Sequence, residues 1–457
     1  MKKGRNCWIW MLLPLLCLVD VTSATGQELL YRIDPPSFAV GDGLGSGGDI
    51  DGDLKFDIVT SASTYGINSF SGSTGNFIAE IIDNPGGTNY GVRLTFAGDL
   101  NGDGHGDWLA SGFYYTFPPK CYLPSESTAR GGALVLSGAD NSVLRSLSSA
   151  NPNNHQDLFG YSSDVIGDLN GDGKGEILIG APTELLAGCQ VSGAGAVHVY
   201  SGATGSEIRT HSGTGIWVSG VGDVNADGKE DYALNDASNI RIYSGVTGSQ
   251  LFSLPALETY GGSLRSLSDI VRRLGDVTAD GIPDFAVGTE QSNQGPGFVR
   301  VISGANGSEV YRINGDSIGD CFGAEIARMS DLDGDGVIDF AVGAPHHSQT
   351  IIPPAPQPHG YVKIVSGRTG LTISRIDSPS IQSSRDYFGL TLAYMGDINN
   401  DGRPELAVGV PGEFTLGAID VYSVNMTPPP STATPVCTIY TAKRGVGPAS
   451  LIPICRR

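Results

Sequence analysis

A nine-residue acidic pattern recurs seven times in the chain, and its residue types suit metal binding. Oxygen-bearing side chains stand at positions 1, 3, 5 and 9 of the pattern, as in DLDGDGVID, the copy that starts at Asp331. Carboxylate and amide oxygens at these positions, with a backbone carbonyl at position 7, can converge on one point. This is the ligand set that Ca²⁺ prefers, and a glycine at position 6 permits the sharp turn of such a loop.

We therefore expect up to seven calcium sites, each with four side-chain ligands. The 28 candidate metal ligands, four from each copy in turn, are Asp49, Asp51, Asp53, Asp57, Asp99, Asn101, Asp103, Asp107, Asp168, Asn170, Asp172, Glu176, Asp223, Asn225, Asp227, Asp231, Asp276, Thr278, Asp280, Asp284, Asp331, Asp333, Asp335, Asp339, Asp397, Asn399, Asp401 and Glu405. The first and fifth copies are expected to bind least well. Leu54 replaces the glycine at position 6 in the first copy, and Thr278 replaces Asp or Asn at position 3 in the fifth.

Two other interpretations of the acidic pattern compete with a calcium loop of this kind. An EF-hand shares the opening residues but needs a bidentate Glu at position 12, where the sixth copy has the strand residue Val342. Acidic turns without metal are the second alternative. Seven copies in register favour a metal, because chance matches to a motif should not repeat in phase.

Short strands must position these loops, because each copy is embedded in the same succession of apolar segments. In the sixth unit the strand Phe322–Met329 leads into the acidic loop and Phe340–Gly343 follows it; a third strand with an SGRTG turn starts at Val362, and Leu371–Ile376 is the fourth. The copies begin 50 to 69 residues apart. A period of this length with four short strands predicts the blades of a β-propeller.

The predicted fold class is therefore all-β, a seven-bladed propeller of four-stranded antiparallel blades. The seventh unit stops after its third strand at Val424, whereas Leu29–Ile33 near the other end of the chain matches a fourth strand. We expect this N-terminal strand to complete the last blade and to close the ring, which hides edges that would otherwise invite aggregation.

Two short motifs relate the units to a known family. Phe-Gly occurs at residues 159, 322 and 388, and Gly-Ala-Pro at residues 180 and 343. With these motifs, residues 29–424 resemble the FG-GAP repeats of integrin α-chain propellers and related secreted proteins. The resemblance implies a calcium-stabilised propeller that binds a protein or polysaccharide. It is incomplete, since the first and fourth units lack Phe-Gly and the seventh has Gly-Val-Pro at residue 409.

The two ends of the chain have a different composition from the repeats. Residues 1–24 carry cations, then an apolar run and small residues, which is typical of a secretory signal peptide. Residues 425–436 are a linker rich in Pro and Thr, and residues 437–457 are a short tail to which no structure is assigned. We expect the protein to be secreted or extracellular, or at a cell surface, with no membrane span. Among the remaining cysteines, Cys121 could pair with Cys189 and Cys437 with Cys455.

The acidic net charge of −20 argues against binding to nucleic acid or anionic lipid. The candidate ligand positions hold 23 of the 48 carboxylates, so much of this charge belongs to the loops. Long loops at 113–131, 183–195 and 346–360 should emerge on the opposite face, where they could bind a protein or polysaccharide partner. We recognise no catalytic constellation. An extracellular polysaccharide-degrading enzyme remains the alternative, and it would need a cluster of Arg, Lys, Tyr or His away from the acidic loops.

Overall fold

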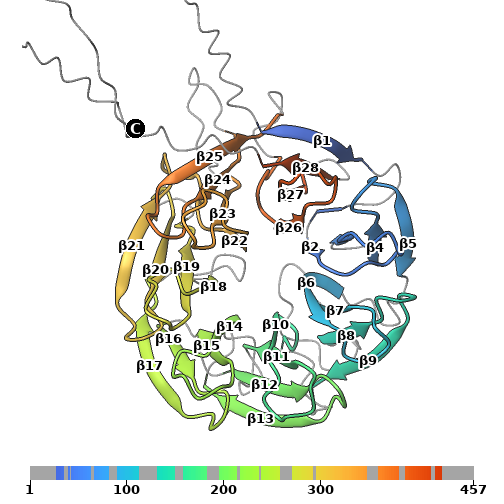
Figure 1. The fold of residues 1–457 in the computed structure, drawn as a ribbon. Coiled ribbons are helices and arrows are strands. Elements are labelled where there is room, and N and C mark those ends of the chain that lie inside the picture. The colour runs from blue at the N-terminus through green and yellow to red at the C-terminus, as the bar shows by residue number, and fades with distance from the viewer. Residues whose placement is uncertain are drawn as a thin grey trace, which may run out of the picture.

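The structure is a computed structural model, and the fold is built from antiparallel strands alone in the part it describes. The described residues are 27–34, 40–41, 43–62, 66–81, 90–112, 131–149, 158–182, 195–213, 217–235, 238–257, 270–291, 295–346, 359–379, 386–412 and 417–424. Within these ranges, 28 strands form seven four-stranded sheets. The sheets are arranged as blades around a common centre (Figure 1). The predicted all-β seven-bladed propeller is confirmed.

The four strands of each blade lie side by side, with the first strand nearest the centre of the ring and the fourth at its rim (Figure 1). The first, innermost strands of blades 1 to 7 are β2 (Gly43–Ser46), β6 (Tyr90–Gly98), β10 (Ser162–Ile166), β14 (Trp217–Gly222), β18 (Ile270–Gly275), β22 (Glu325–Arg328) and β26 (Leu392–Gly396). The second strands are β3 (Ile58–Ala62), β7 (Asp107–Gly112), β11 (Glu176–Ala181), β15 (Asp231–Asn235), β19 (Asp284–Thr289), β23 (Phe340–Ala344) and β27 (Glu405–Val410).

The two outer strands complete each blade. The third strands are β4 (Gly66–Phe70), β8 (Gly132–Leu136), β12 (Ala196–Ser201), β16 (Asn239–Tyr243), β20 (Phe298–Ile302), β24 (Tyr361–Val365) and β28 (Ala418–Ser423). The fourth, at the rim, are β5 (Phe77–Ile81), β9 (Val143–Ser148), β13 (Glu207–Ser212), β17 (Gln250–Pro255), β21 (Glu309–Asn314), β25 (Thr372–Asp377) and β1 (Glu28–Ile33).

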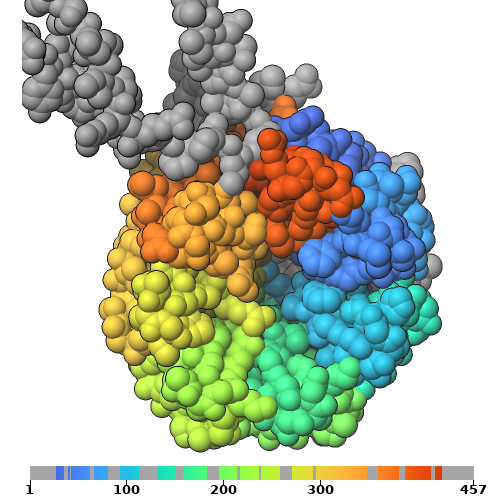
Figure 2. All heavy atoms as spheres, viewed as in Figure 1, coloured from blue at the N-terminus to red at the C-terminus, as the bar shows by residue number. Residues whose placement is uncertain are grey.

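The N-terminal strand closes the ring, as the sequence predicts. β1 pairs antiparallel with β28, from Glu28 opposite Ser423 to Ile33 opposite Ile419. It therefore supplies the fourth strand of blade 7, whose other strands come from the end of the described chain. Strands from the two ends of the chain thus share one sheet, and the blades form successive sectors of a single disc (Figure 2).

The hydrophobic core is divided among the junctions between blades. The buried residues form seven clusters in the described part of the chain, and each cluster draws on two neighbouring blades. The cluster between blades 7 and 1 contains Ile33 of β1 together with Leu44, Ile58 and Ile419. The closing junction is therefore packed in the same way as the others. Burial of apolar surface between blades is the main force that holds such a ring together.

The Phe-Gly and Gly-Ala-Pro motifs contact each other within a blade. The Phe-Gly glycine donates its backbone N–H to the carbonyl of the second-strand glycine, at 3.0 Å from Gly323 to Gly343 in blade 6 and 3.1 Å from Gly160 to Gly180 in blade 3. The residue before the Phe is left-handed, with φ 57° at Cys321. This turn explains one error of the sequence analysis. The strand predicted over Phe322–Met329 begins only at Glu325, because Phe-Gly is a turn despite its apolar phenylalanine.

Candidate metal centre

All seven acidic loops emerge on one face of the propeller. Each loop joins the first strand of a blade to its second, and every blade has the same antiparallel order, so the loops leave at equivalent ends. The first strand carries position 1 of the loop to the face, and the second strand begins at position 9 or just after it. The structure thus places the 28 predicted ligands in seven equivalent groups.

The backbone of each loop is left-handed at two positions. Position 6 has positive φ throughout, from 64° to 90°, and is glycine except at Leu54. Position 4 also has positive φ, from 57° to 86°, and is Gly, Ala or Asn. The recurring glycine predicts the left-handed backbone at position 6, whereas the mixture of Gly, Ala and Asn at position 4 does not reveal it there. Leu54 adopts the same left-handed conformation as the glycines, so the loop of blade 1 keeps the common shape.

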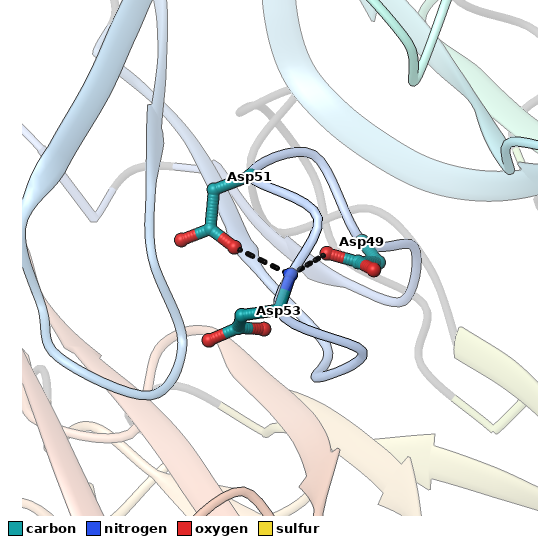
Figure 3. Close-up of side chains that lie close together, drawn as sticks. All are labelled: Asp49, Asp51 and Asp53. Atoms are coloured by element: carbon teal, nitrogen blue, oxygen red, sulfur yellow. Dashed lines mark hydrogen bonds between the residues drawn. The ribbon is translucent and has the colours of Figure 1, made fainter.

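The carboxylate at position 1 organises the loop from inside. In blade 1, Asp49 Oδ1 accepts the N–H of Gly52 at 2.7 Å and of Asp53 at 2.9 Å, while Oδ2 accepts that of Leu54 at 2.9 Å. Asp331 of blade 6 makes the same three contacts. Figure 3 shows the backbone nitrogen of Asp53 bonded to Asp49 and, by a second bond, to Asp51. The carboxylate at position 1 therefore holds the loop in its curved shape by accepting three of its backbone N–H groups.

The side chains at positions 3 and 5 repeat this pattern on a shorter scale. Asp51 Oδ1 accepts the N–H of Asp53 at 3.1 Å, and Asp53 Oδ1 accepts that of Lys55 at 2.9 Å. In blades 1, 3, 4 and 7 the second oxygen at position 5 accepts a serine hydroxyl from the end of the third strand or the turn after it, as in Ser244 to Asp227 at 3.2 Å. Asx turns of this kind hold three side chains on the concave side of one loop.

Position 9 has a different environment, because its carboxylate is fully buried. Asp339 Oδ2 accepts the N–H of Leu332 at 2.7 Å and of Asp333 at 3.2 Å, and its Oδ1 accepts that of Gly367 at 2.9 Å. Gly367 lies in the outer turn of the same blade, the turn that joins its third strand to its fourth. Burial raises the pKa of Asp339 to about 6 in spite of these bonds. Position 9 thus ties the acidic loop to the outer turn.

The preceding blade also donates a hydrogen bond to this outer turn. Tyr311 of β21 in blade 5 donates its hydroxyl to the carbonyl of Gly367 in blade 6, and Tyr31 of β1 does the same to Gly72 in blade 1. In blades 2 and 3 an arginine takes this place: Arg145 donates to Ala203 and Arg209 to Val246. Each of these acidic loops is therefore linked through one glycine turn to the neighbouring blade.

Three loops bring carboxylate oxygens close enough to share one cation. One oxygen from each of three residues lies within 4.8 Å of the others in Asp49–Asp51–Asp53, in Asp168–Asp172–Glu176 and in Asp331–Asp333–Asp339. All are hard oxygen donors, which fits Ca²⁺ and does not fit a metal that prefers nitrogen or sulfur. Three carboxylates at this spacing repel one another, at roughly 3 kcal/mol for one pair about 5 Å apart at an effective dielectric of 20. The donor set therefore fits calcium.

The structure does not separate the loops as the sequence analysis ranked them. Blade 1, expected to be weak because of Leu54, holds one of the three close carboxylate groups. The loops outside these three groups have an amide or hydroxyl at position 3, namely Asn101, Asn225, Thr278 and Asn399. Their ligand positions keep the same backbone arrangement, as Asp223 shows by accepting the N–H of Asp227 at 2.9 Å and of Gly228 at 2.7 Å.

A charged cluster that the sequence analysis missed lies among the innermost strands. Arg272 of blade 5 bonds Glu325 of blade 6 at 2.9 Å, and Arg93 of blade 2 approaches the same carboxylate at 3.5 Å. The guanidinium of Arg93 also lies 4.0 Å from the centre of the Trp217 ring. Burial lowers the pKa of Arg93 to about 10. Charged residues in otherwise apolar strands are a sequence signal for such a cluster. Which of them meet across the ring depends on how the closed ring places the blades.

The candidate ligand-binding loops lie almost wholly outside the described residues. Of the loops 113–131, 183–195 and 346–360, the structure describes only Gly131, Gly195, His346, His359 and Gly360. His346 is buried, and its Nδ1 lies 3.6 Å from Asp320 Oδ1. The predicted Cys121–Cys189 and Cys437–Cys455 pairs, the signal peptide, the linker and the tail also lie outside the described residues.

Comparison with known proteins agrees with the motifs. The family model for the FG-GAP repeat matches residues 159–200 and 393–422. The chain is 30% identical to integrin alpha-V of Gallus gallus over 187 residues, which are 40% of this chain and 17% of that protein. It is 31% identical to integrin alpha-PS2 of Drosophila melanogaster over 157 residues, 34% of this chain and 11% of that protein. The chain therefore matches less than a fifth of the length of these relatives.

The repeats, the fold and the relatives point the same way. Both segments matched by the family model are blades of the ring: residues 159–200 run from the Phe-Gly turn to the third strand of blade 3, and residues 393–422 cover the corresponding strands of blade 7. No helix in the described ranges is long and apolar enough to cross a membrane. The chain is a seven-bladed β-propeller that carries FG-GAP repeats and is similar over part of its length to integrin α chains.

Proposed function

We propose that this protein is a secreted, calcium-binding propeller that acts as an adhesion or ligand-binding module for an extracellular protein or polysaccharide. The observation that carries the proposal is the set of seven equivalent acidic loops on one face, with three carboxylate oxygens within 4.8 Å in three of them. The similarity to integrin α chains supports an extracellular binding role. The relatives' names concern whole proteins much longer than the matched part.

Calcium would be held by the side chains at positions 1, 3, 5 and 9 of the loops. Bound Ca²⁺ supplies positive charge that offsets the repulsion among these carboxylates. The chain's own residues set the loop shape in advance, because backbone N–H groups already hold the carboxylates at positions 1 and 9 in place. Metal binding would then stabilise the junctions between blades, since position 9 bonds Gly367, which Tyr311 contacts from the preceding blade.

We place ligand binding on the face opposite the acidic loops. The loops at 113–131, 183–195 and 346–360 join second to third strands, and in an antiparallel blade these connections leave at the other end from the acidic loops. The first of them carries five aromatic residues within 113–122. Aromatic loops on a rigid scaffold suit recognition of a glycan or a protein surface.

The proposal is tested by probing an array of glycans and extracellular-matrix proteins with the secreted protein, with and without EGTA. We expect specific binding to at least one class of ligand, with loss of binding in EGTA. Deletion of residues 114–129, between β7 and β8 in the chain, should abolish binding without changing the melting temperature. Binding to none of the arrayed ligands would contradict the adhesion role, and binding that ignores EGTA would contradict its calcium dependence.

The alternative, an extracellular polysaccharide-degrading enzyme, requires a basic or aromatic cluster away from the acidic loops. The Arg93, Arg272 and Glu325 cluster has that composition, but both guanidiniums are directed at the same carboxylate. This pairing favours a brace across the ring over a catalytic set. Release of reducing sugar from any polysaccharide on the array, lost in Glu325→Gln, would favour the enzyme.

A further inference from the structure

In two acidic loops, a lysine from the next blade donates its ammonium group to the residue at position 1. Lys174, at position 7 of the blade 3 loop, places its Nζ 2.5 Å from the carbonyl oxygen of Asp99 in blade 2 and 3.5 Å from Asp99 Oδ1. Lys229 of blade 4 does the same to Asp168 of blade 3, at 2.5 Å from the carbonyl oxygen and 3.7 Å from Oδ2. In both cases the contacted residue is position 1 of the loop.

A third lysine repeats the contact where the ring closes. Lys55 of blade 1 donates its Nζ to the carbonyl oxygen of Asp397 in blade 7 at 2.7 Å, and also to Asn400 Oδ1. The loops of blades 2, 3 and 7 therefore each carry a positive charge supplied by the next blade. We call Lys55, Lys174 and Lys229 the latch lysines.

The loops of blades 4 and 5 have an apolar neighbour at the same place. Position 7 is Ile282 in blade 5 and Val337 in blade 6. Ile282 packs against the hydrophobic cluster that contains Val224 of the blade 4 loop. Val337 belongs to a cluster with Val277 of the blade 5 loop. These five loops thus differ in the charge of their neighbour as well as in their own ligands.

We propose that the latch lysines divide these five acidic loops into two classes of calcium affinity, a proposal that rests on the proposed calcium binding. In the latched loops the ammonium group offsets part of the carboxylate repulsion, so these loops keep their shape without metal. The same charge opposes a divalent ion: a unit charge about 6 Å from Ca²⁺ weakens binding roughly tenfold even at the dielectric constant of water. Loops beside Ile282 or Val337 bind more tightly but depend more on the metal for their shape.

Blades 2 and 4 form a matched pair for testing this. Both loops present Asp, Asn, Asp and Asp at positions 1, 3, 5 and 9, and both have glycine at position 6. They differ in the neighbouring side chain, which is Lys174 for blade 2 and Ile282 for blade 4. Reciprocal substitutions, Lys174→Met and Ile282→Lys, therefore exchange the neighbours while leaving both ligand sets unchanged.

The test is calorimetric titration of the full-length secreted protein with Ca²⁺, resolved into tight and weak sites. We expect Lys174→Met to move one site from the weak to the tight class, about tenfold in affinity, and Ile282→Lys to move one site the other way. Adding Asp99→Ala to Lys174→Met should remove the gained site. Arg312→Met is the control, because Arg312 pairs with Glu309 on the rim strand β21, away from the loops.

Melting curves in EGTA and in saturating Ca²⁺ provide a second measurement, independent of the titration. Lys174→Met should lower the melting temperature in EGTA more than it does in saturating Ca²⁺, because the metal replaces the missing charge. If Ca²⁺ binds but neither reciprocal variant moves a site between classes, the latch proposal is overturned while calcium binding stands. If neither the parent protein nor any variant shows heat of Ca²⁺ binding, the proposed calcium binding itself is overturned.

Discussion

At the scale of single residues, two left-handed backbone positions decide which side chains an acidic loop tolerates. Position 6 is glycine in six loops and leucine in blade 1, where Leu54 has φ 64° and is 89% exposed. A left-handed conformation costs an L-residue with a Cβ atom about 1–2 kcal/mol. The exposed side chain of Leu54 gains little packing to offset this cost, so Leu54 marks a strained residue in an otherwise regular loop.

Replacing Leu54 by glycine should therefore stabilise the protein. We expect Leu54→Gly to raise the free energy of unfolding by about 1 kcal/mol, since relief of the strain exceeds the added chain entropy of glycine in the unfolded state. Denaturant unfolding in EGTA measures this without a contribution from metal. Leu54→Ala is the matched control: it removes the side chain but keeps the Cβ, and equal stabilisation by both variants would refute the strain.

A second residue-level prediction concerns His211 of β13, which lies at the junction between blades 3 and 4. Its Nε2 is 2.8 Å from the hydroxyl of Tyr232, and burial together with the nearby Arg209 lowers the pKa of His211 to about 4. Between pH 6.5 and 4 the unfolded chain then binds a proton at this residue that the folded protein does not. Stability at this site is therefore present above pH 6.5 and is lost as the pH falls towards 4.

His211→Phe keeps an aromatic ring against Tyr243 and removes the titrating group. We expect its melting temperature to fall less steeply than that of the parent between pH 6.5 and 4. Above pH 7 the two curves should run parallel. Equal slopes for the two proteins across the acid range would show that His211 does not titrate as its surroundings require.

At the scale of elements, the Phe-Gly turns of blades 6 and 7 fit closely over the second strand of the preceding blade. A Cβ added at Gly343 would lie 2.0 Å from the carbonyl oxygen of Gly389 in the next blade. Gly288 is similarly placed against Gly323, at 2.3 Å. The glycine of the Gly-Ala-Pro motif is therefore required for contact between blades as well as for the hydrogen bond within its own blade.

Gly343→Ala should consequently be among the most disruptive small substitutions in the propeller. Because the clashing atom belongs to the backbone, the two blades must separate, and we expect a loss of about 3 kcal/mol or more in the free energy of unfolding. Gly334→Ala is the control, since a Cβ there meets nothing within 4 Å and costs only its positive φ of 77°. Similar losses for the two variants, measured by denaturant unfolding, would contradict the close approach.

The elements also show what the sequence could and could not predict. The second strands were predictable because apolar runs such as Phe340–Gly343 follow every acidic loop, and the repeat itself indicated seven blades. The start of β22 was not, because the Phe-Gly turn looks like strand. The latch lysines and the Arg93–Glu325 pair were beyond prediction, since they join residues of different blades and depend on how the ring brings those blades together.

At the scale of the whole molecule, the ring is closed by a strand with two roles. β1 completes the sheet of blade 7, and Tyr31 on the same strand donates its hydroxyl to the outer turn of blade 1 at Gly72. Gly72 also donates its N–H to Asp57, the buried carboxylate of the first acidic loop, at 2.9 Å. Closure of the propeller and the shape of an acidic loop therefore share the same turn.

The net charge of −20 comes in large part from the acidic loops. With 23 of 48 carboxylates at the candidate ligand positions, much of the acidity is concentrated on one face, where it destabilises the folded protein unless a cation offsets it. A ligand that binds only the folded state adds about 2.7 kcal/mol of stability per site at a hundred times its dissociation constant. Calcium should therefore stabilise the whole ring.

Thermal unfolding at controlled free Ca²⁺ tests this central claim most directly. We predict that the melting temperature falls in EGTA and rises steadily with the logarithm of free Ca²⁺, while Asp331→Ala combined with Asp333→Ala reduces the rise. Mg²⁺ at the same concentrations should have a smaller effect, because the loops supply the flexible oxygen cage that calcium prefers. A melting curve that is the same in EGTA and in millimolar Ca²⁺ would contradict calcium binding by the acidic loops.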